Sequence, residues 1–97
     1  MRRARFSSEA EQEVREAREW YLNLGEALDQ AFEQDLHAVV EQIRRFPSAA
    51  AKVRGEIRRI PLRRFPYSVF YRERERDLFI LAVLHQARHP ARWPVGP

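Results

Sequence analysis

The 97-residue sequence contains no cysteine, only three glycines and a single lysine, Lys52. Without cysteine, the chain has neither disulfide bonds nor thiolate metal sites. So few glycines also leave no glycine-rich loop for phosphate binding. The longest apolar run, residues 78–84, is too short to cross a bilayer, and no apolar stretch of leader length follows the basic residues at the start. We therefore expect a cytoplasmic protein that has no membrane partner.

Charge is divided unevenly along the chain. Residues 1–50 carry 7 Lys or Arg and 10 Asp or Glu, a net charge of −3, whereas residues 51–97 carry 11 and 4, a net charge of +7. All but one of the 18 basic residues are arginine, whose planar guanidinium favours two-point contact with carboxylates and phosphates. The basic half indicates an acidic protein partner or a nucleic acid. Codon bias of the genome is the other explanation for the excess of arginine.

The first half of the sequence predicts two helices. Apolar residues recur at steps of three and four over residues 8–24 and again over residues 26–46. Ser8 and Glu11 have the spacing of a capping box at the start of the first helix, and Pro47 ends the second. Because the connection between them is short, we expect an antiparallel helical hairpin.

The second half changes to the alternating period of strands. The predicted strands are residues 3–6, 56–62, 67–72 and 78–84, with loops at residues 48–55 and 73–77. The nearly all-apolar segment 78–84 should lie at the centre of the sheet, covered on both faces. The predicted class is α+β, in the order β-α-α-β-β-β, with the helical hairpin packed on a small, mainly antiparallel sheet. The length allows one domain, residues 1–97, in which about residues 86–97 form a basic tail.

Five stretches, taken in order, resemble the RelE/ParE superfamily of toxins. They are residues 5–10 (RFSSEA), Trp20-Tyr21, residues 43–47 (IRRFP), residues 58–72 (RRIPLRRFPYSVFYR) and residues 80–90 (ILAVLHQARHP). The resemblance covers nearly the whole chain without large gaps. The segment Leu84-His85-Gln86-Ala87-Arg88 is more similar to the ParE-like branch.

The resemblance implies the toxin of a type II toxin–antitoxin (plasmid stabilisation) system. Its partner would be a cognate acidic antitoxin that wraps the toxin, and operator DNA would be reached only through that antitoxin. ParE-like members poison DNA gyrase, whereas other members cleave mRNA on the ribosome without a metal, so the superfamily does not fix the activity. We expect growth inhibition by binding DNA gyrase, with no cofactor. The alternatives are a ribosome-dependent, metal-independent mRNA endonuclease and a non-toxic binding module of the same fold.

Candidate functional residues gather in the basic half. The residues expected to bind the target are Arg58, Arg64, His85, Arg88, Arg92 and Trp93. Metal-independent RNA cleavage needs a group that takes the 2′-hydroxyl proton, a group that protonates the leaving oxygen, and cations for the phosphate. If the chain is a nuclease, these groups would come from His85, Arg64, Arg88 and Tyr71.

Two observations disfavour the nuclease. The resemblance implies a lysine-rich patch and a tyrosine near the C-terminus in mRNA-cleaving members, but Lys52 is the only lysine and no tyrosine follows Tyr71. His85 also has a simpler interpretation, as a strand-end residue hydrogen-bonded to the backbone. Trp93 either anchors the tail to the domain or lies under the antitoxin, and the sequence leaves both open.

Overall fold

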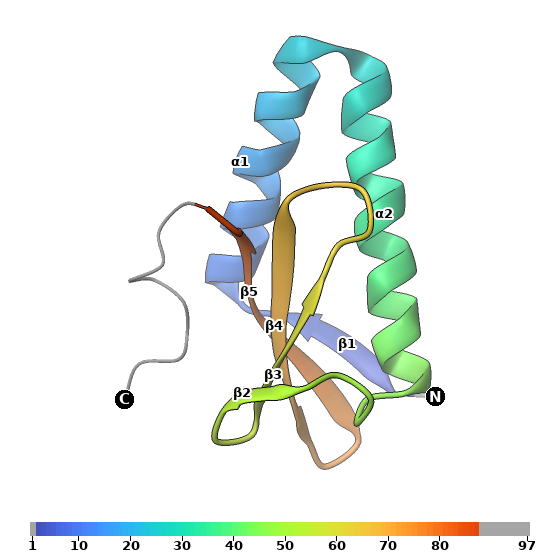
Figure 1. Ribbon diagram of the computed structural model, residues 1–97, viewed down its shortest axis with the longest axis vertical. Coiled ribbons are helices and arrows are strands. Elements are labelled where there is room, and N and C mark those ends of the chain that lie inside the picture. The colour runs from blue at the N-terminus through green and yellow to red at the C-terminus, as the bar shows by residue number, and fades with distance from the viewer. Residues whose placement is uncertain (1, 88–97) are drawn as a thin grey trace.

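In the computed structural model, which describes residues 2–87, two helices lie on one face of a five-stranded sheet (Figure 1). In chain order the elements are β1 (Arg3–Phe6), α1 (Ser8–Leu24), α2 (Glu26–Arg45), β2 (Lys52–Arg54), β3 (Ile57–Pro61), β4 (Tyr67–Arg74) and β5 (Asp77–His85). The predicted α+β class and element order are confirmed. One short strand, β2, is added within the segment expected to be a loop. None of the described helices has the length and apolar character needed to cross a membrane.

The helical hairpin closes through a single residue, Gly25. Its N–H donates to the carbonyl oxygens of Tyr21 (2.9 Å) and Leu22 (3.1 Å), and its φ of 159° is one that L side chains rarely adopt. At the start of α1 the predicted cap is one residue late. Ser7, not Ser8, is the N-cap, and its Oγ accepts the N–H of Ala10 at 3.0 Å.

The sheet has the order β1-β5-β4-β3-β2. Only β1 and β5 pair in parallel, so the prediction of a mainly antiparallel sheet is confirmed. β5 lies inside the sheet as expected, but the middle strand is β4, because β3 and the unforeseen β2 both add on its far side. Burial along β5 is also less complete than predicted, since Phe79 and Leu81 are half-buried.

A bulge in β5 changes which side chains face the helices. Phe70 pairs with Ala82 and Tyr71 pairs with Ile80, so Leu81 is an extra residue. Before the bulge, Ile80 faces the helical core; after it, Ala82 joins Phe70 on the opposite face of the sheet.

The β4–β5 turn is also tighter than the predicted loop over residues 73–77. Arg74 pairs with Asp77, which leaves two turn residues, and Glu75 takes a φ of 58°.

Beyond the end of β1, residues at the start of the helical hairpin cover the edge of β5. The Glu13 carboxylate accepts the N–H of Val83 at 2.9 Å, and the Ser7 hydroxyl donates to the Leu81 carbonyl at 3.1 Å. These side chains give β5 backbone groups the partners that a longer β1 would have supplied.

Aromatic rings join the helical hairpin to the sheet. Tyr21 of α1 stacks on Phe32 of α2 at 5.6 Å, and both rings contact Phe65 and Tyr67 edge-on. Tyr21 therefore lies in the hairpin core. Trp20, its neighbour in sequence, does not, because it is 53% exposed.

Candidate functional surfaces

The β3–β4 turn carries two arginines outward because a buried carboxylate holds its backbone. Asp35 of α2 is 5% exposed and accepts N–H groups from Arg63 (3.1 Å), Arg64 (2.8 Å) and Phe65 (3.1 Å). These bonds fix the direction of the turn, and the Arg63 and Arg64 side chains are exposed. Sequence reasoning did not single out Asp35. The sequence feature that could have revealed it is a carboxylate within the apolar stripe of a helix, three residues after Phe32.

His85 lies at the same end of the sheet as this turn. It pairs with Tyr67 across β4 and β5, and the two rings meet edge-on at 5.2 Å. The next residue, Gln86, donates its N–H to the carbonyl of Pro66 in the turn at 2.7 Å. His85 Nδ1 accepts the N–H of Ala87 at 3.1 Å, as the strand-end interpretation predicted. When the ring is neutral, this bond places its proton on Nε2.

Arg58 and Tyr71 lie elsewhere. They pair with each other on β3 and β4, and Tyr71 is four residues from Tyr67, about 13 Å along the strand. Tyr71 is fully buried, its hydroxyl donates to the Pro47 carbonyl at 2.7 Å, and burial raises its pKa. The hydroxyl therefore lies inside the protein and is bonded to its backbone.

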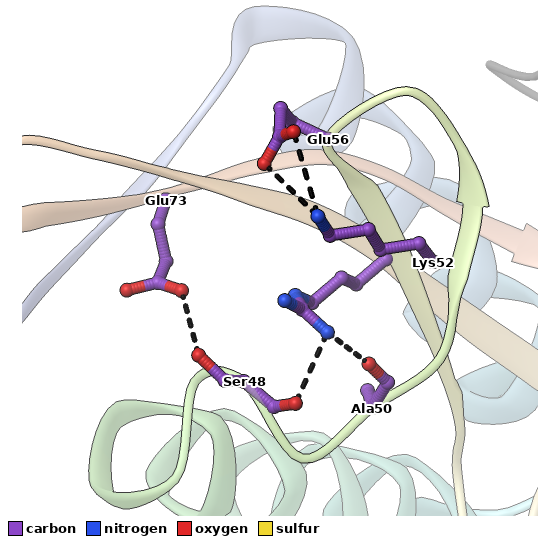
Figure 2. A network of polar contacts seen from close by, with 6 residues as sticks. Ser48, Ala50, Lys52, Glu56 and Glu73 are labelled. Atoms are coloured by element: carbon purple, nitrogen blue, oxygen red, sulfur yellow. Dashed lines mark hydrogen bonds and ion pairs between the residues drawn. The ribbon is translucent and has the colours of Figure 1, made fainter.

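The Arg58 guanidinium holds the loop after α2. Its Nη1 donates to the carbonyl oxygens of Ser48 (3.0 Å) and Ala50 (2.6 Å). Figure 2 shows these two bonds together with the contact between the Ser48 hydroxyl and Glu73 at 3.2 Å. Arg58 and Arg59 occupy opposite faces of β3, and Arg59 donates to the Ser68 hydroxyl at 3.0 Å.

The structure therefore divides the predicted site. Arg64 and His85 are brought to one end of the sheet, whereas Arg58 and Tyr71 form a separate group that holds a loop. Three further residues of the predicted site, Arg88, Arg92 and Trp93, lie outside the described residues. Within residues 2–87, no group of three or more His, Asp or Glu side chains is placed to hold a metal ion.

A surface absent from the prediction lies between α2 and β3. Two adjoining hollows, of about 300 and 640 Å³, share Gln42 and Phe46, and we name them together the α2–β3 groove. The lining residues are Ala38, Glu41, Gln42, Ile43, Arg45, Phe46, Ala49, Ala50, Ala51, Arg59, Ile60, Pro61 and Arg63. Phe46 is 62% exposed although it follows directly after α2. The groove thus combines apolar surface with arginines.

A second apolar surface lies at the tip of the helical hairpin. Trp20, Leu22, Leu24 and Leu28 are each between 40% and 62% exposed. Leu24 and Leu28 continue the apolar stripes of the two helices past the sheet, where no described element covers them.

Comparison with known proteins identifies the family. Residues 4–90 match the family described as "ParE toxin of type II toxin-antitoxin system, parDE". The chain belongs to this family, which confirms the resemblance seen in the sequence and its ParE-like branch.

A solved structure, titled "Chromosomal ParDE TA system from P. aeruginosa", is similar to this chain. The two are 21% identical, the match covers 88% of this chain and 96% of the other, and the TM-score is 0.69. At this identity the likeness shows the fold. The search of curated proteins gives no match.

Proposed function

We propose that this ParE-family toxin inhibits growth by binding DNA gyrase and is neutralised by a cognate antitoxin. The observation that carries the proposal is the family match over residues 4–90. In this view the protein acts in the cytoplasm, where its target is. The basic half of the chain, with its net charge of +7, supplies attraction for an acidic partner.

Binding to a protein target fits the described surface better than RNA cleavage does. Of the residues considered for catalysis, Tyr71 is buried and its hydroxyl is used by the Pro47 carbonyl. His85 pairs with the core residue Tyr67, and its Nδ1 is occupied by the backbone of Ala87. Arg63 and Arg64 are exposed on a turn whose backbone is held by Asp35, and such cations contact acidic groups on proteins.

Pulsed expression followed by separate analysis of DNA and mRNA tests the gyrase proposal. We expect wild type to cause gyrase-linked DNA breaks and to leave mRNA intact. The His85→Gln variant should behave in the same way, because an inhibitor needs no proton transfer. In a nuclease, loss of a general acid or base would cost about 10²–10⁴-fold in rate. A folded but non-toxic His85→Gln variant, with wild type cutting mRNA on ribosomes, would show that the chain is an endonuclease.

The α2–β3 groove is the proposed antitoxin surface. An amphipathic segment could lay apolar side chains against Phe46 and its acidic side chains beside Arg45 and Arg63. Such an interface should bury more than about 2,000 Å² in total if the pair is obligate.

A charged residue in the groove should weaken the complex. We expect Phe46→Glu to lower antitoxin affinity about 100-fold or more in titration calorimetry, as loss of a buried aromatic anchor does. Trp20→Glu is the matched control, because Trp20 is similarly exposed but lies at the hairpin tip. Equal losses from both variants would place the antitoxin elsewhere.

If the wild-type chain is harmless in cells without a partner, the chain is the non-toxic binding module.

A further inference from the structure

Four arginines line a hollow beside the end of α2. The hollow measures about 520 Å³, and its lining residues are Arg2, Arg44, Arg45, Pro47 and Arg76. We name it the arginine hollow. The arginines come from three separate parts of the chain: the residue before β1, the last turn of α2 and the β4–β5 turn. Figure 1 shows the start of β1 lying beside the end of α2.

Two of the arginines are held in fixed positions. Arg2 donates to the Glu75 carbonyl at 2.9 Å and pairs with the Glu73 carboxylate at 3.0 Å. The Arg44 Nε donates to the Arg2 carbonyl at 2.6 Å, and its Nη1 pairs with Glu41 at 2.7 Å. These contacts order two long side chains before any ligand arrives, so less rotamer entropy is lost on binding.

The other two arginines carry charge that the described part of the chain does not neutralise. Arg45 and Arg76 are both exposed, and neither forms an ion pair within residues 2–87. The two paired carboxylates, Glu41 and Glu73, compensate only half of the four guanidinium charges. The lining itself contains no acidic residue. A concave surface with a net positive charge concentrates anions.

We propose that the arginine hollow binds the phosphodiester backbone of a nucleic acid, in addition to the protein contacts proposed above. Guanidinium groups form two-point hydrogen bonds to phosphate oxygens, and contacts to the backbone need cations and donors without any base-reading surface. An acidic peptide is a poorer fit, because protein partners also bury apolar side chains. In the hollow only Pro47 is uncharged, whereas the neighbouring α2–β3 groove offers the apolar surface that a peptide uses.

This contact differs from operator recognition through an antitoxin. It requires no particular base sequence, and the toxin makes it without the antitoxin. A toxin with such a hollow would hold the nucleic acid present at its target as well as the target protein.

Fluorescence anisotropy with labelled duplex DNA and a labelled RNA hairpin, across a range of NaCl concentrations, tests the proposal. The full-length chain is compared with Arg45→Gln/Arg76→Gln and with Arg15→Gln/Lys52→Gln. The second double variant has the same net charge, and its two substitutions lie at exposed positions away from the hollow. The slope of log K against log salt is negative, and we expect the first double variant to reduce its magnitude by about 2. Each of the two single variants should reduce it by about 1. Affinity at low salt should fall about tenfold or more, whereas the control should keep its slope.

Circular dichroism first establishes that all variants are folded. A greater effect on DNA or on RNA would identify which nucleic acid the hollow prefers, and either supports the proposal. Equal losses in the two double variants would overturn it, because the attraction would then be spread over the whole basic surface. Absence of binding to both probes at low salt would also overturn it. A glutamate-rich peptide that competes as tightly as DNA would make the hollow a peptide site. Gyrase is absent from this assay, so its outcome is independent of the gyrase proposal.

Discussion

The β3–β4 turn and the loop after α2 are held by anchors of opposite charge. The β3–β4 turn before Tyr67 is held by a carboxylate, Asp35, which accepts three backbone N–H groups. The loop after α2 is held by a guanidinium, Arg58, which donates to two carbonyl oxygens, and by the Tyr71 hydroxyl on a third. Backbone N–H and carbonyl groups outside helices and strands also need hydrogen-bond partners. Here the negative carboxylate binds N–H groups, and the positive guanidinium binds carbonyl oxygens.

The two anchors differ in burial and in what they join. Asp35 is 5% exposed and joins α2 to the β3–β4 turn. Arg58 is half-buried and joins β3 to the loop after α2. Loss of a charge anchor leaves its partners without bonds, and the cost increases with burial. The comparison therefore predicts a larger loss of stability at the Asp35 anchor than at the Arg58 anchor.

Removing the carboxylate should have the largest effect. We expect Asp35→Ala to lower the free energy of unfolding by about 3–4 kcal/mol, because three N–H groups lose a charged acceptor. Urea denaturation measures this directly. Glu33→Ala, on the same helix, removes a surface ion pair with Arg18 and should cost about 0–1 kcal/mol. Similar values for the two variants would mean that the Asp35 anchor contributes little.

Removing the guanidinium should have an intermediate effect. Arg58→Gln loses the charged donor to the carbonyl oxygens of Ser48 and Ala50. Because water can reach this loop, we expect a loss of about 1–2 kcal/mol in the same denaturation experiment. Arg58→Lys keeps the charge and sharpens the test. If it restores full stability, charge alone is sufficient; if not, the planar guanidinium is required.

Removing only the hydroxyl of Tyr71, the second donor to this loop, should have a smaller effect. Tyr71→Phe keeps the buried ring and deletes the bond to Pro47, for an expected loss of about 1 kcal/mol. Proton exchange of the Arg59 amide, which bonds the Ala51 carbonyl at the end of the same loop, should become faster. An unchanged amide and unchanged stability would show that Arg58 holds the loop alone.

The same tyrosine should produce a small pH effect. Burial raises the pKa of Tyr71 above its ordinary value of 10.0, so the unfolded chain loses this proton at a lower pH than the folded chain does. The stability contribution is therefore fully present below about pH 10 and is lost as the pH rises through the folded-state value. Thermal melting at increasing alkaline pH should show a steeper loss for wild type than for Tyr71→Phe. Parallel profiles for the two proteins would contradict a raised pKa for Tyr71 in the folded state.

The helical hairpin was predictable because its apolar residues repeat at helical spacing over two long segments. β2 was not, since Lys52, Val53 and Arg54 are all exposed and carry no alternation of burial. That strand exists through pairing with β3, a tertiary effect that local sequence does not encode. The same limit applies to the bulge at Leu81, which sets the side-chain directions of the last strand and depends on register with β4.

The candidate site was predicted less well than the fold. Reasoning from charge and chemistry grouped Arg58 and Tyr71 with His85, but register places them on separate parts of the sheet. Asp35 was missed because a carboxylate in a helix usually lies on its solvated side. The arginine hollow was missed because its members, at positions 2, 44, 45 and 76, are distant in sequence and meet only after folding.

The parallel pairing of β1 with β5 bears on the timing of folding. Arg3 pairs with Asp77 and Phe6 with Ile80, so the first strand can take its place only after the last one has formed. Such contacts, separated by most of the chain, carry a large loop-closure cost and form late. During synthesis, the helical hairpin can form while β5 is still inside the ribosome, but the sheet cannot close. A newly made toxin therefore stays incomplete until β5 has left the ribosome.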